Sequence, residues 1–189
     1  AKVLINDVAT GELLAIMDGE VITATRTAAV TAVATKYMSR PDAKTGAFIG
    51  CGNQTRSQIE AVLRVRDLAK LHLFDLSKER AQSLAKRFPD RDICVCDSLE
   101  ECLYEADIVT TLTPSRKGFV HHDWLKPVVH INAVGADAEG KRELDPSVLK
   151  GIDLVTYDEW VQCSHSGEIQ YLHELEEEHT MVQSWCPLS

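Results

Sequence analysis

The chain has 189 residues, of which 44% are hydrophobic and 26% charged, so it is neither a disordered tail nor a collagen-like repeat. Its 20 Lys and Arg against 29 Asp and Glu leave a net charge of −9, which argues against nucleic acid or an anionic membrane as the main partner. No apolar run approaches the roughly 18 residues that a membrane span needs. An acidic chain can still bind one nucleotide through backbone amides at a helix N-terminus.

Residues 1–40 predict a hairpin followed by a helix. Apolar residues at 3–5 and 13–17 flank a turn-prone tract, which is typical of a short β-hairpin. An Ala- and Val-rich segment at 28–38 predicts a helix that is capped by Thr23 or Thr25. The sequence Ser-Arg-Pro-Asp at 39–42 ends this helix and is the expected domain boundary, so 1–40 is interpreted as part of a second domain.

After residue 46, short apolar runs alternate with amphipathic segments of helical length. This alternation predicts βαβ units, and therefore an α/β fold with a doubly wound, mostly parallel sheet of Rossmann-like type. The expected domain spans 41–170, and 171–189 is expected to be an acidic, helical tail. Helices are expected after each of the first three strands, and the third helix starts with a capping box formed by Ser98 and Glu101. The six expected strands lie at 47–49, 71–74, 93–96, 108–112, 128–134 and 154–155.

Six cysteines favour free thiols in a reducing, cytoplasmic compartment, because a chain of this size needs no disulfides and no signal peptide precedes them. Cys94, Cys96 and Cys102 raise a zinc hypothesis, but Cys94 and Cys96 are closer together than the cysteines of a zinc knuckle. We therefore expect buried thiols that pack as small apolar side chains, and no metal site. Adjacent His121 and His122 point to opposite faces of a strand and are likewise expected to be structural.

A glycine-rich sequence follows the strand at 47–49 and opens a helix, which is the setting of a dinucleotide fingerprint. Gly50 permits a tight turn, and Gly52 lets the backbone approach a pyrophosphate. The amides of Asn53 and Gln54 would then face its charge. A threonine replaces the third glycine of the fingerprint, so a plain turn between strand and helix remains the alternative.

Two aspartates follow later strands of the expected sheet. Asp75 ends the strand after the glycine-rich turn, where a carboxylate accepts hydrogen bonds from ribose hydroxyls and repels a 2′-phosphate. It favours NAD over NADP, and a solvated turn acid is the alternative. Asp137 lies in a polar loop at the carboxyl ends of the strands, where doubly wound sheets bind ligands. It is the candidate for acid/base catalysis, and the alternative is a loop aspartate that only caps its own backbone.

Five blocks of sequence extend over about residues 3–169: ITATRTAA at 22–29, GCGNQ at 50–54, TPSRK at 113–117, HINAVGAD at 130–137 with GKRELD at 140–145, and SGEI at 166–169. Their order resembles the ornithine cyclodeaminase, archaeal-type alanine dehydrogenase and mu-crystallin family. The resemblance implies an NAD-dependent cytoplasmic enzyme that removes hydride from the α-carbon of a small L-amino acid and gives an imine. Either water or a tethered side-chain amine then adds to the imine.

The resemblance also implies roles for particular residues. Arg26 would hold the substrate carboxylate, for which a bidentate guanidinium is suited. Asp137 would handle protons as ammonia leaves. The residues implied on the cofactor side, beside Asn53, Gln54 and Asp75, are Thr113, Asn132, Ala133, Val134 and Lys141.

Family members carry a longer N-terminal region, which supplies a substrate lysine and another arginine, and a C-terminal segment that helps to build a dimer. We therefore expect a fragment or a shortened member: a Rossmann domain with a remnant of the substrate and dimerisation domain of a homodimer. One alternative is a mu-crystallin-like protein that binds a nicotinamide nucleotide and a small ligand with little catalysis. That branch resembles an NADP binder, which Asp75 opposes. A purely structural module rests only on the acidic tail and the small-residue helix.

Overall fold

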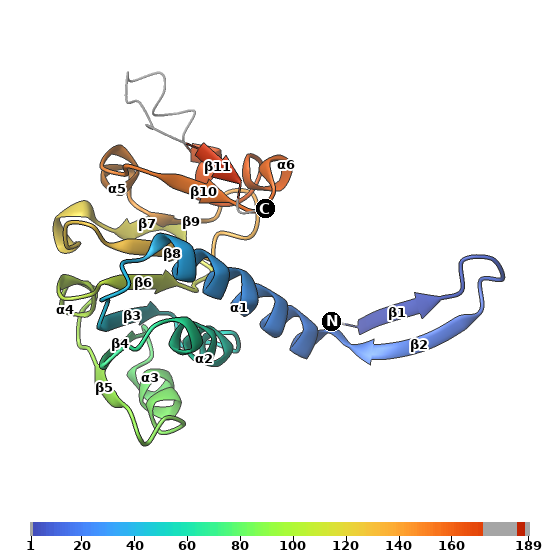
Figure 1. Cartoon of the computed structure of the whole chain (residues 1–189), viewed down its shortest axis with the longest axis horizontal. Helices are drawn as coiled ribbons and strands as arrows, with labels where there is room; N and C mark the ends of the chain where they lie inside the picture. Colours follow the sequence, from blue (N-terminus) through green and yellow to red (C-terminus); the bar gives the residue numbers. More distant parts are fainter. Residues whose placement is uncertain (1, 172–184, 188–189) are drawn as a thin grey trace.

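A five-stranded parallel sheet forms the centre of the fold in this computed structural model, which describes residues 2–171 and 185–187 (Figure 1). The strand order is β5-β4-β3-β6-β8, so the chain builds outward from β3 on one side and then returns to the other. This order confirms the α/β, doubly wound fold expected from the sequence. The strands are β3 (Thr45–Ile49), β4 (Lys70–Phe74), β5 (Asp92–Val95), β6 (Ile108–Thr111) and β8 (His130–Ala133).

The sixth expected strand is wrong as a member of this sheet. Its residues fall in β10 (Val155–Tyr157), which pairs in parallel with β11 (Trp185–Pro187) in a separate two-stranded sheet. β10 is only partly buried, whereas β6 is buried throughout, as expected of a central strand covered on both faces. The expected helical tail lies largely outside the described residues, and the part of it that is described at 185–187 is a strand.

Helices cover both faces of the parallel sheet. α2 (Thr55–Val65) and α3 (Lys78–Ala85) pack on one face, and α4 (Leu99–Tyr104) packs on the other. The first face buries an apolar cluster that includes Phe48, Ile59, Leu73, Leu84 and Ile108. The second buries Ala47, Ile49, Leu103, Val109 and Leu144. Alternate residues of each strand thus supply two separate cores.

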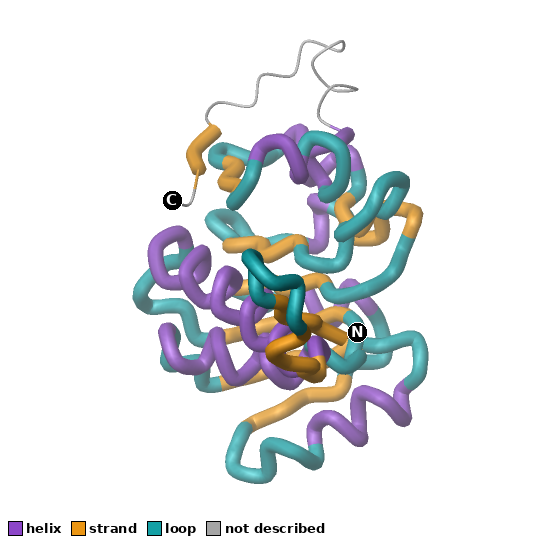
Figure 2. The backbone as a smooth tube through the Cα atoms, turned by 90° about the vertical axis from the view of Figure 1, so that its right-hand side faces the viewer, coloured by secondary structure: helices purple, strands orange, loops and turns teal. Residues whose placement is uncertain are grey.

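The helix α1 (Gly19–Met38) lies alongside α2 and reaches β8 (Figures 1 and 2). It begins earlier than expected. Asp18 is the N-cap, and its carboxylate accepts a hydrogen bond of 2.8 Å from the Glu20 amide, so the expected cap at Thr23 or Thr25 is wrong. An aspartate cap followed by an acidic first turn outweighs the weak helix propensity of the β-branched residues that follow.

The expected hairpin is confirmed and projects away from the sheet (Figure 1). It consists of β1 (Lys2–Asn6) and β2 (Leu13–Asp18), which pair antiparallel. Apolar side chains on it, including Leu4, Leu14 and Ile16, are more than 60% exposed. The hairpin is therefore an apolar arm outside both cores.

The segment after β6 contains short elements that the sequence did not predict. β7 (Arg116–Val120) and β9 (Arg142–Leu144) pair in parallel beside the main sheet. The remaining elements are η1 (His122–Trp124), α5 (Pro146–Lys150), α6 (Trp160–Cys163) and η2 (Glu168–Tyr171). Among the described residues, no helix has the length and hydropathy that a membrane span requires.

Candidate active site

The glycine-rich loop lies where the strand order reverses, since β3 pairs with both β4 and β6. Gly50 has a φ of +91°, and a Cβ on it would lie 2.8 Å from the carbonyl oxygen of Leu112. Its amide donates to the carbonyl oxygen of Phe74 at 2.8 Å. Thr55, which replaces the third glycine of the fingerprint, is buried and donates its hydroxyl to the Gly50 carbonyl oxygen at 2.6 Å. The turn therefore requires glycine at position 50. Hydrogen bonds to Phe74 of β4 and from Thr55 of α2 hold it in place.

The N-terminus of α2 lies beside open space. A Cβ built on Gly52 would meet no heavy atom within 4 Å. Gln54 is the N-cap residue but makes no side-chain cap hydrogen bond, and its Oε1 is buried without a hydrogen-bond partner among the described residues. Asn53 instead donates its side-chain amide to Glu20 of α1 at 3.2 Å. An uncapped helix N-terminus, an open glycine and an unsatisfied amide fit the phosphates and hydroxyls of a dinucleotide.

Asp75 connects the glycine-rich loop to the loop after β4. Its Oδ2 accepts the amide of Cys51 at 2.7 Å, and its Oδ1 accepts the amide of Ser77 at 2.8 Å. The carboxylate is half-buried and held by backbone donors, so it is an organised part of the site and not a freely solvated acid. Burial, together with the charge of Asp75, raises the pKa of the Cys51 thiol to about 12 and keeps it protonated.

A buried carboxylate that the sequence analysis did not single out joins the ends of β6 and β8. Glu143 is fully buried, and its Oε1 accepts the amide and the hydroxyl of Thr113, both at 2.7 Å. Its Oε2 accepts the Thr111 hydroxyl at 2.6 Å and the Gly135 amide at 2.8 Å. Burial raises the pKa of Glu143, although these four hydrogen bonds oppose the shift. The only sequence signal was its place within the block at 140–145.

A second buried acid supports the first from η2. Glu168 Oε1 accepts the Glu143 amide at 2.6 Å, whereas its Oε2 has no partner among the described residues. Burial, reinforced by the negative charge of Glu143, raises the pKa of Glu168 to about 7. Gln170 of the same turn accepts the Gly140 amide at 3.1 Å, so η2 also holds the loop that follows β8.

That loop carries the acid/base candidate. Asp137 forms an ion pair with Lys141, and 64% of the Asp137 side chain is exposed. The Asp137 amide donates to the Gly135 carbonyl oxygen at 2.9 Å, next to the donor that Glu143 holds. The loop thus presents an accessible carboxylate, and the buried Glu143 holds the backbone of the loop at Gly135.

The side chains of Asn132 and Thr113, which are implied on the cofactor side, are hydrogen-bonded within the protein. Asn132 is buried and donates to the hydroxyls of Thr35 on α1 at 3.1 Å and Thr110 on β6 at 3.4 Å. The Thr113 hydroxyl donates to Glu143. Cofactor contacts of Asn132 and Thr113 would therefore come chiefly from their backbone atoms. Ala133 is exposed and Val134 is half-buried as the chain leaves β8.

Arg26 lies on α1, and 66% of its side chain is exposed. Its partner is Asp158, after β10, at 3.3 Å, a residue that the sequence analysis missed. A guanidinium held by one exposed carboxylate can exchange that partner for the carboxylate of a ligand. Among the described residues, no hydrogen bond or ion pair joins Arg26 to Asp137.

The structure thus brings most of the predicted residues to one edge of the sheet. The carboxyl ends of the parallel strands β3, β4, β6 and β8 share that edge (Figure 1). The segments that follow these strands carry, in the same order, Gly50, Asp75, Thr113 and Asp137. A family model described as "Ornithine cyclodeaminase/mu-crystallin family" matches residues 1–185. The chain belongs to this family.

Curated relatives in the ornithine cyclodeaminase/mu-crystallin family carry different names. Alanine dehydrogenase of Archaeoglobus fulgidus is 38% identical over 169 residues, which cover 89% of this chain and 52% of that protein. Ketimine reductase mu-crystallin of Rattus norvegicus is 36% identical over 89% of this chain and 54% of its own length. Ornithine cyclodeaminase of Agrobacterium tumefaciens is 35% identical over 96% of this chain and 51% of its own length. The chain spans about half the length of these relatives.

Solved structures agree with this assignment. An archaeal alanine dehydrogenase dimer with bound NAD matches with a TM-score of 0.82 and 36% identity, over 92% of this chain and 54% of that chain. The Delta(1)-pyrroline-2-carboxylate reductase of Thermococcus litoralis, in complex with NADH and L-proline, matches with a TM-score of 0.84 and 32% identity. That match covers 95% of this chain and 56% of the reductase. The resemblance found in the sequence is confirmed at the level of family and fold.

Proposed function

We propose that this chain binds NAD and forms the cofactor half of an enzyme that acts on the α-carbon of a small L-amino acid. The observation that carries the proposal is the organisation of Asp75, whose carboxylate is fixed by the Cys51 and Ser77 amides beside the open Gly52. A carboxylate at this place accepts ribose hydroxyls and repels a 2′-phosphate. The NAD and NADH complexes of the structural neighbours support the same cofactor.

The chemistry follows from the residues that surround this edge. NAD, which Asp75 and the N-terminus of α2 would hold, would supply the hydride acceptor through which the Cα–H bond of the substrate is oxidised to an α-imine. Arg26 would orient the substrate through its carboxylate. Asp137 would accept the proton that the amino nitrogen releases, and it would return a proton when ammonia leaves. Lys141, which forms an ion pair with Asp137, would hold this carboxylate in position.

The type of reaction is proposed as that of alanine dehydrogenase or ornithine cyclodeaminase. Water adding to the imine gives a keto acid, whereas a tethered side-chain amine gives a ring. The second candidate is a mu-crystallin-like protein that binds nucleotide and a small ligand with little catalysis, and the 36% identity to the rat protein supports it. The accessible Asp137, paired with Lys141, favours retained chemistry.

Titration of the chain with NADH and with NADPH tests the cofactor assignment through nicotinamide fluorescence. Tighter binding of NADH is expected, and tighter binding of NADPH would overturn the assignment. Turnover of L-alanine, L-ornithine and L-proline is then measured with this chain and with any longer protein that contains it. If Asp137→Asn leaves turnover unchanged, Asp137 has no part in the mechanism.

A further inference from the structure

A pocket of about 470 Å³ opens beside the edge strand β5, between β4, β5 and α4. None of the residues assigned above to cofactor or substrate lines it. Its lining includes two cysteines, one histidine and three glutamates, with Lys70 as the basic residue. The proposed function uses none of these groups, although together they are the side chains that bind soft metal ions.

Two thiols in this pocket have the separation that a shared metal ion requires. Cys94 lies on β5 and Cys96 directly follows it, so their side chains project from the same face of the strand. Their Sγ atoms are 4.0 Å apart. Two thiolates bound to tetrahedral zinc at about 2.3 Å lie about 3.8 Å from each other. The spacing of one residue, too short for a zinc knuckle, therefore suits a pair of ligands on a strand.

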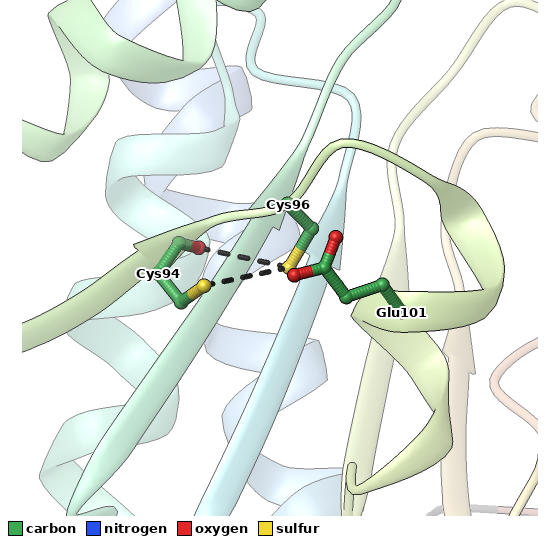
Figure 3. A group of neighbouring side chains, drawn as sticks. All are labelled: Cys94, Cys96 and Glu101. Atoms are coloured by element: carbon green, nitrogen blue, oxygen red, sulfur yellow. Dashed lines mark hydrogen bonds between the residues drawn. The ribbon is translucent and has the colours of Figure 1, made fainter.

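Glu101 brings a carboxylate to the two thiols. One of its oxygens and both Sγ atoms all lie within 4.8 Å of one another, and Figure 3 shows the carboxylate turned toward the sulfur of Cys96. The side chain is already oriented, because its Oε2 accepts the Asp97 amide at 2.8 Å at the start of α4. A metal ion bound here would thus meet three ligands without refolding of the backbone.

A buried histidine with an unpartnered ring nitrogen among the described residues is a second indication that this pocket binds a ligand. His72 lines the same pocket, is only 5% exposed and pairs in register with Cys94 across β4 and β5. Its Nδ1 lies 3.1 Å from the carbonyl oxygen of Cys102, and because a carbonyl only accepts, Nδ1 carries the proton. In this tautomer the lone pair is on Nε2, which is buried without a hydrogen-bond partner among the described residues.

We propose that Cys94, Cys96 and Glu101 bind a thiophilic divalent metal ion, Zn²⁺, and that a water molecule fills the fourth position in the pocket that His72 also lines. Binding forms two sulfur–metal bonds and one bond from a Glu101 oxygen to the metal, releases both thiol protons and part of the ion's hydration shell to solvent, and changes no oxidation state. Two thiolates and one carboxylate exceed the charge of the ion by one, which the Lys70 ammonium offsets. The ion would tie β5 to α4.

The test is titration of the full chain with Co²⁺ in a phosphine reductant, which does not compete as a thiol would. One equivalent of Co²⁺ is expected to give a thiolate-to-cobalt charge-transfer band in the near ultraviolet and the visible bands of a tetrahedral site. Zn²⁺ is expected to remove both. If the folded protein at saturating Co²⁺ shows no charge-transfer band, the proposal is overturned.

Variants locate the site and exclude a general effect of substitution. Cys94→Ser and Cys96→Ser are each expected to lose about half of the charge-transfer band and to weaken Co²⁺ binding by more than about tenfold. Glu101→Gln keeps the helix cap and removes the charge, so it should weaken binding with the band intact. The matched controls Glu100→Gln and Cys163→Ser should bind as the unaltered chain does.

Folding of each variant is followed by NADH binding, to which none of these residues contributes. If a cysteine variant fails to fold, the comparison of Glu101→Gln with Glu100→Gln decides the question. Equal affinity in these two glutamine variants, or an undiminished band in folded Cys96→Ser, would contradict the proposed site.

Discussion

The candidate site contains four carboxylates whose surroundings differ. Asp75 is held by two backbone amides at the edge of the sheet, and Asp137 is exposed beside a lysine. Glu143 is buried among four donors. Glu168 is buried with one oxygen unpartnered among the described residues. The first two can meet a ligand, whereas the buried pair fixes the backbone that presents them.

Asp75→Asn should weaken NADH binding by about 1–3 kcal/mol, because the new amide places an N–H group against the backbone amide of Cys51 or Ser77. Loss of the negative charge should also reduce discrimination against NADPH. Fluorescence titration with both nucleotides measures the two effects. Asp97→Asn is the control, since Asp97 is an exposed acid on the neighbouring loop. Unchanged discrimination in Asp75→Asn would show that the charge does not select the cofactor.

Glu168 should make stability depend on pH. Its pKa is about 7 in the folded chain against 4.5 for an unperturbed group, so the folded state binds a proton that the unfolded state has lost between these values. The contribution of Glu168 to the free energy of unfolding should therefore fall by up to about 3 kcal/mol as pH rises from 4.5 to 7. His130 opposes it: burial lowers the pKa of this histidine from 6.5 to about 4, so its contribution rises over nearly the same range. Urea unfolding of the unaltered chain and of Glu168→Gln at several pH values separates the two contributions. The free energy of unfolding of Glu168→Gln should rise more steeply with pH between 4.5 and 7 than that of the unaltered chain, and an identical pH dependence of the two proteins would contradict the role of Glu168.

At the scale of elements, the turn after β3 contains two glycines with different roles: one adopts a backbone conformation that favours glycine, and the other leaves space for a ligand. Gly50→Ala should destabilise the fold by about 1–3 kcal/mol, because φ is +91° and the added Cβ would approach the Leu112 carbonyl oxygen. Gly52→Ala has free space and should leave stability nearly unchanged, yet it should weaken NADH binding by occupying the approach to the helix N-terminus. Chemical unfolding and NADH titration of both variants test the contrast. Equal stability of the two would contradict the strained turn.

The elements that the sequence predicted are those with a clear apolar period or a capping motif. Buried strands such as β3 and β6 are apolar enough to be found, and Ser98 caps α4 as expected, with its Oγ accepting the Glu101 amide at 3.1 Å. β7 and β9 were missed, because their polar residues give no alternation and because, among the strands that the structure describes, they form a two-stranded sheet of their own. The role of Glu143 could not be predicted, since its burial depends on donors from separate segments.

At the scale of the whole molecule, the hairpin leaves apolar side chains that neither core of the chain covers. Its exposed apolar side chains form a surface that soluble monomers seldom leave open to water. The archaeal alanine dehydrogenase neighbour is a dimer. We expect the chain to self-associate through β1 and β2.

Leu14→Lys together with Ile16→Lys should shift the chain toward monomer in sedimentation velocity, because two ammonium groups would be buried in the contact. NADH binding should not change, since the hairpin lies apart from the sheet (Figure 1). Val161→Lys, at an exposed apolar position on α6, is the matched control. Self-association that survives the double substitution would place the contact elsewhere.

The arrangement around Glu143 also has a consequence for synthesis. Its carboxylate fixes residues from the ends of β6 and β8, and its own amide is in turn held by Glu168. During translation, the strands of the sheet and the glycine-rich turn emerge before β9 and η2. The ends of β6 and β8 therefore lack Glu143 until β9 leaves the ribosome, and Glu143 lacks its support from Glu168 until η2 follows. We therefore expect the nascent chain to acquire its sheet early and its cofactor affinity late.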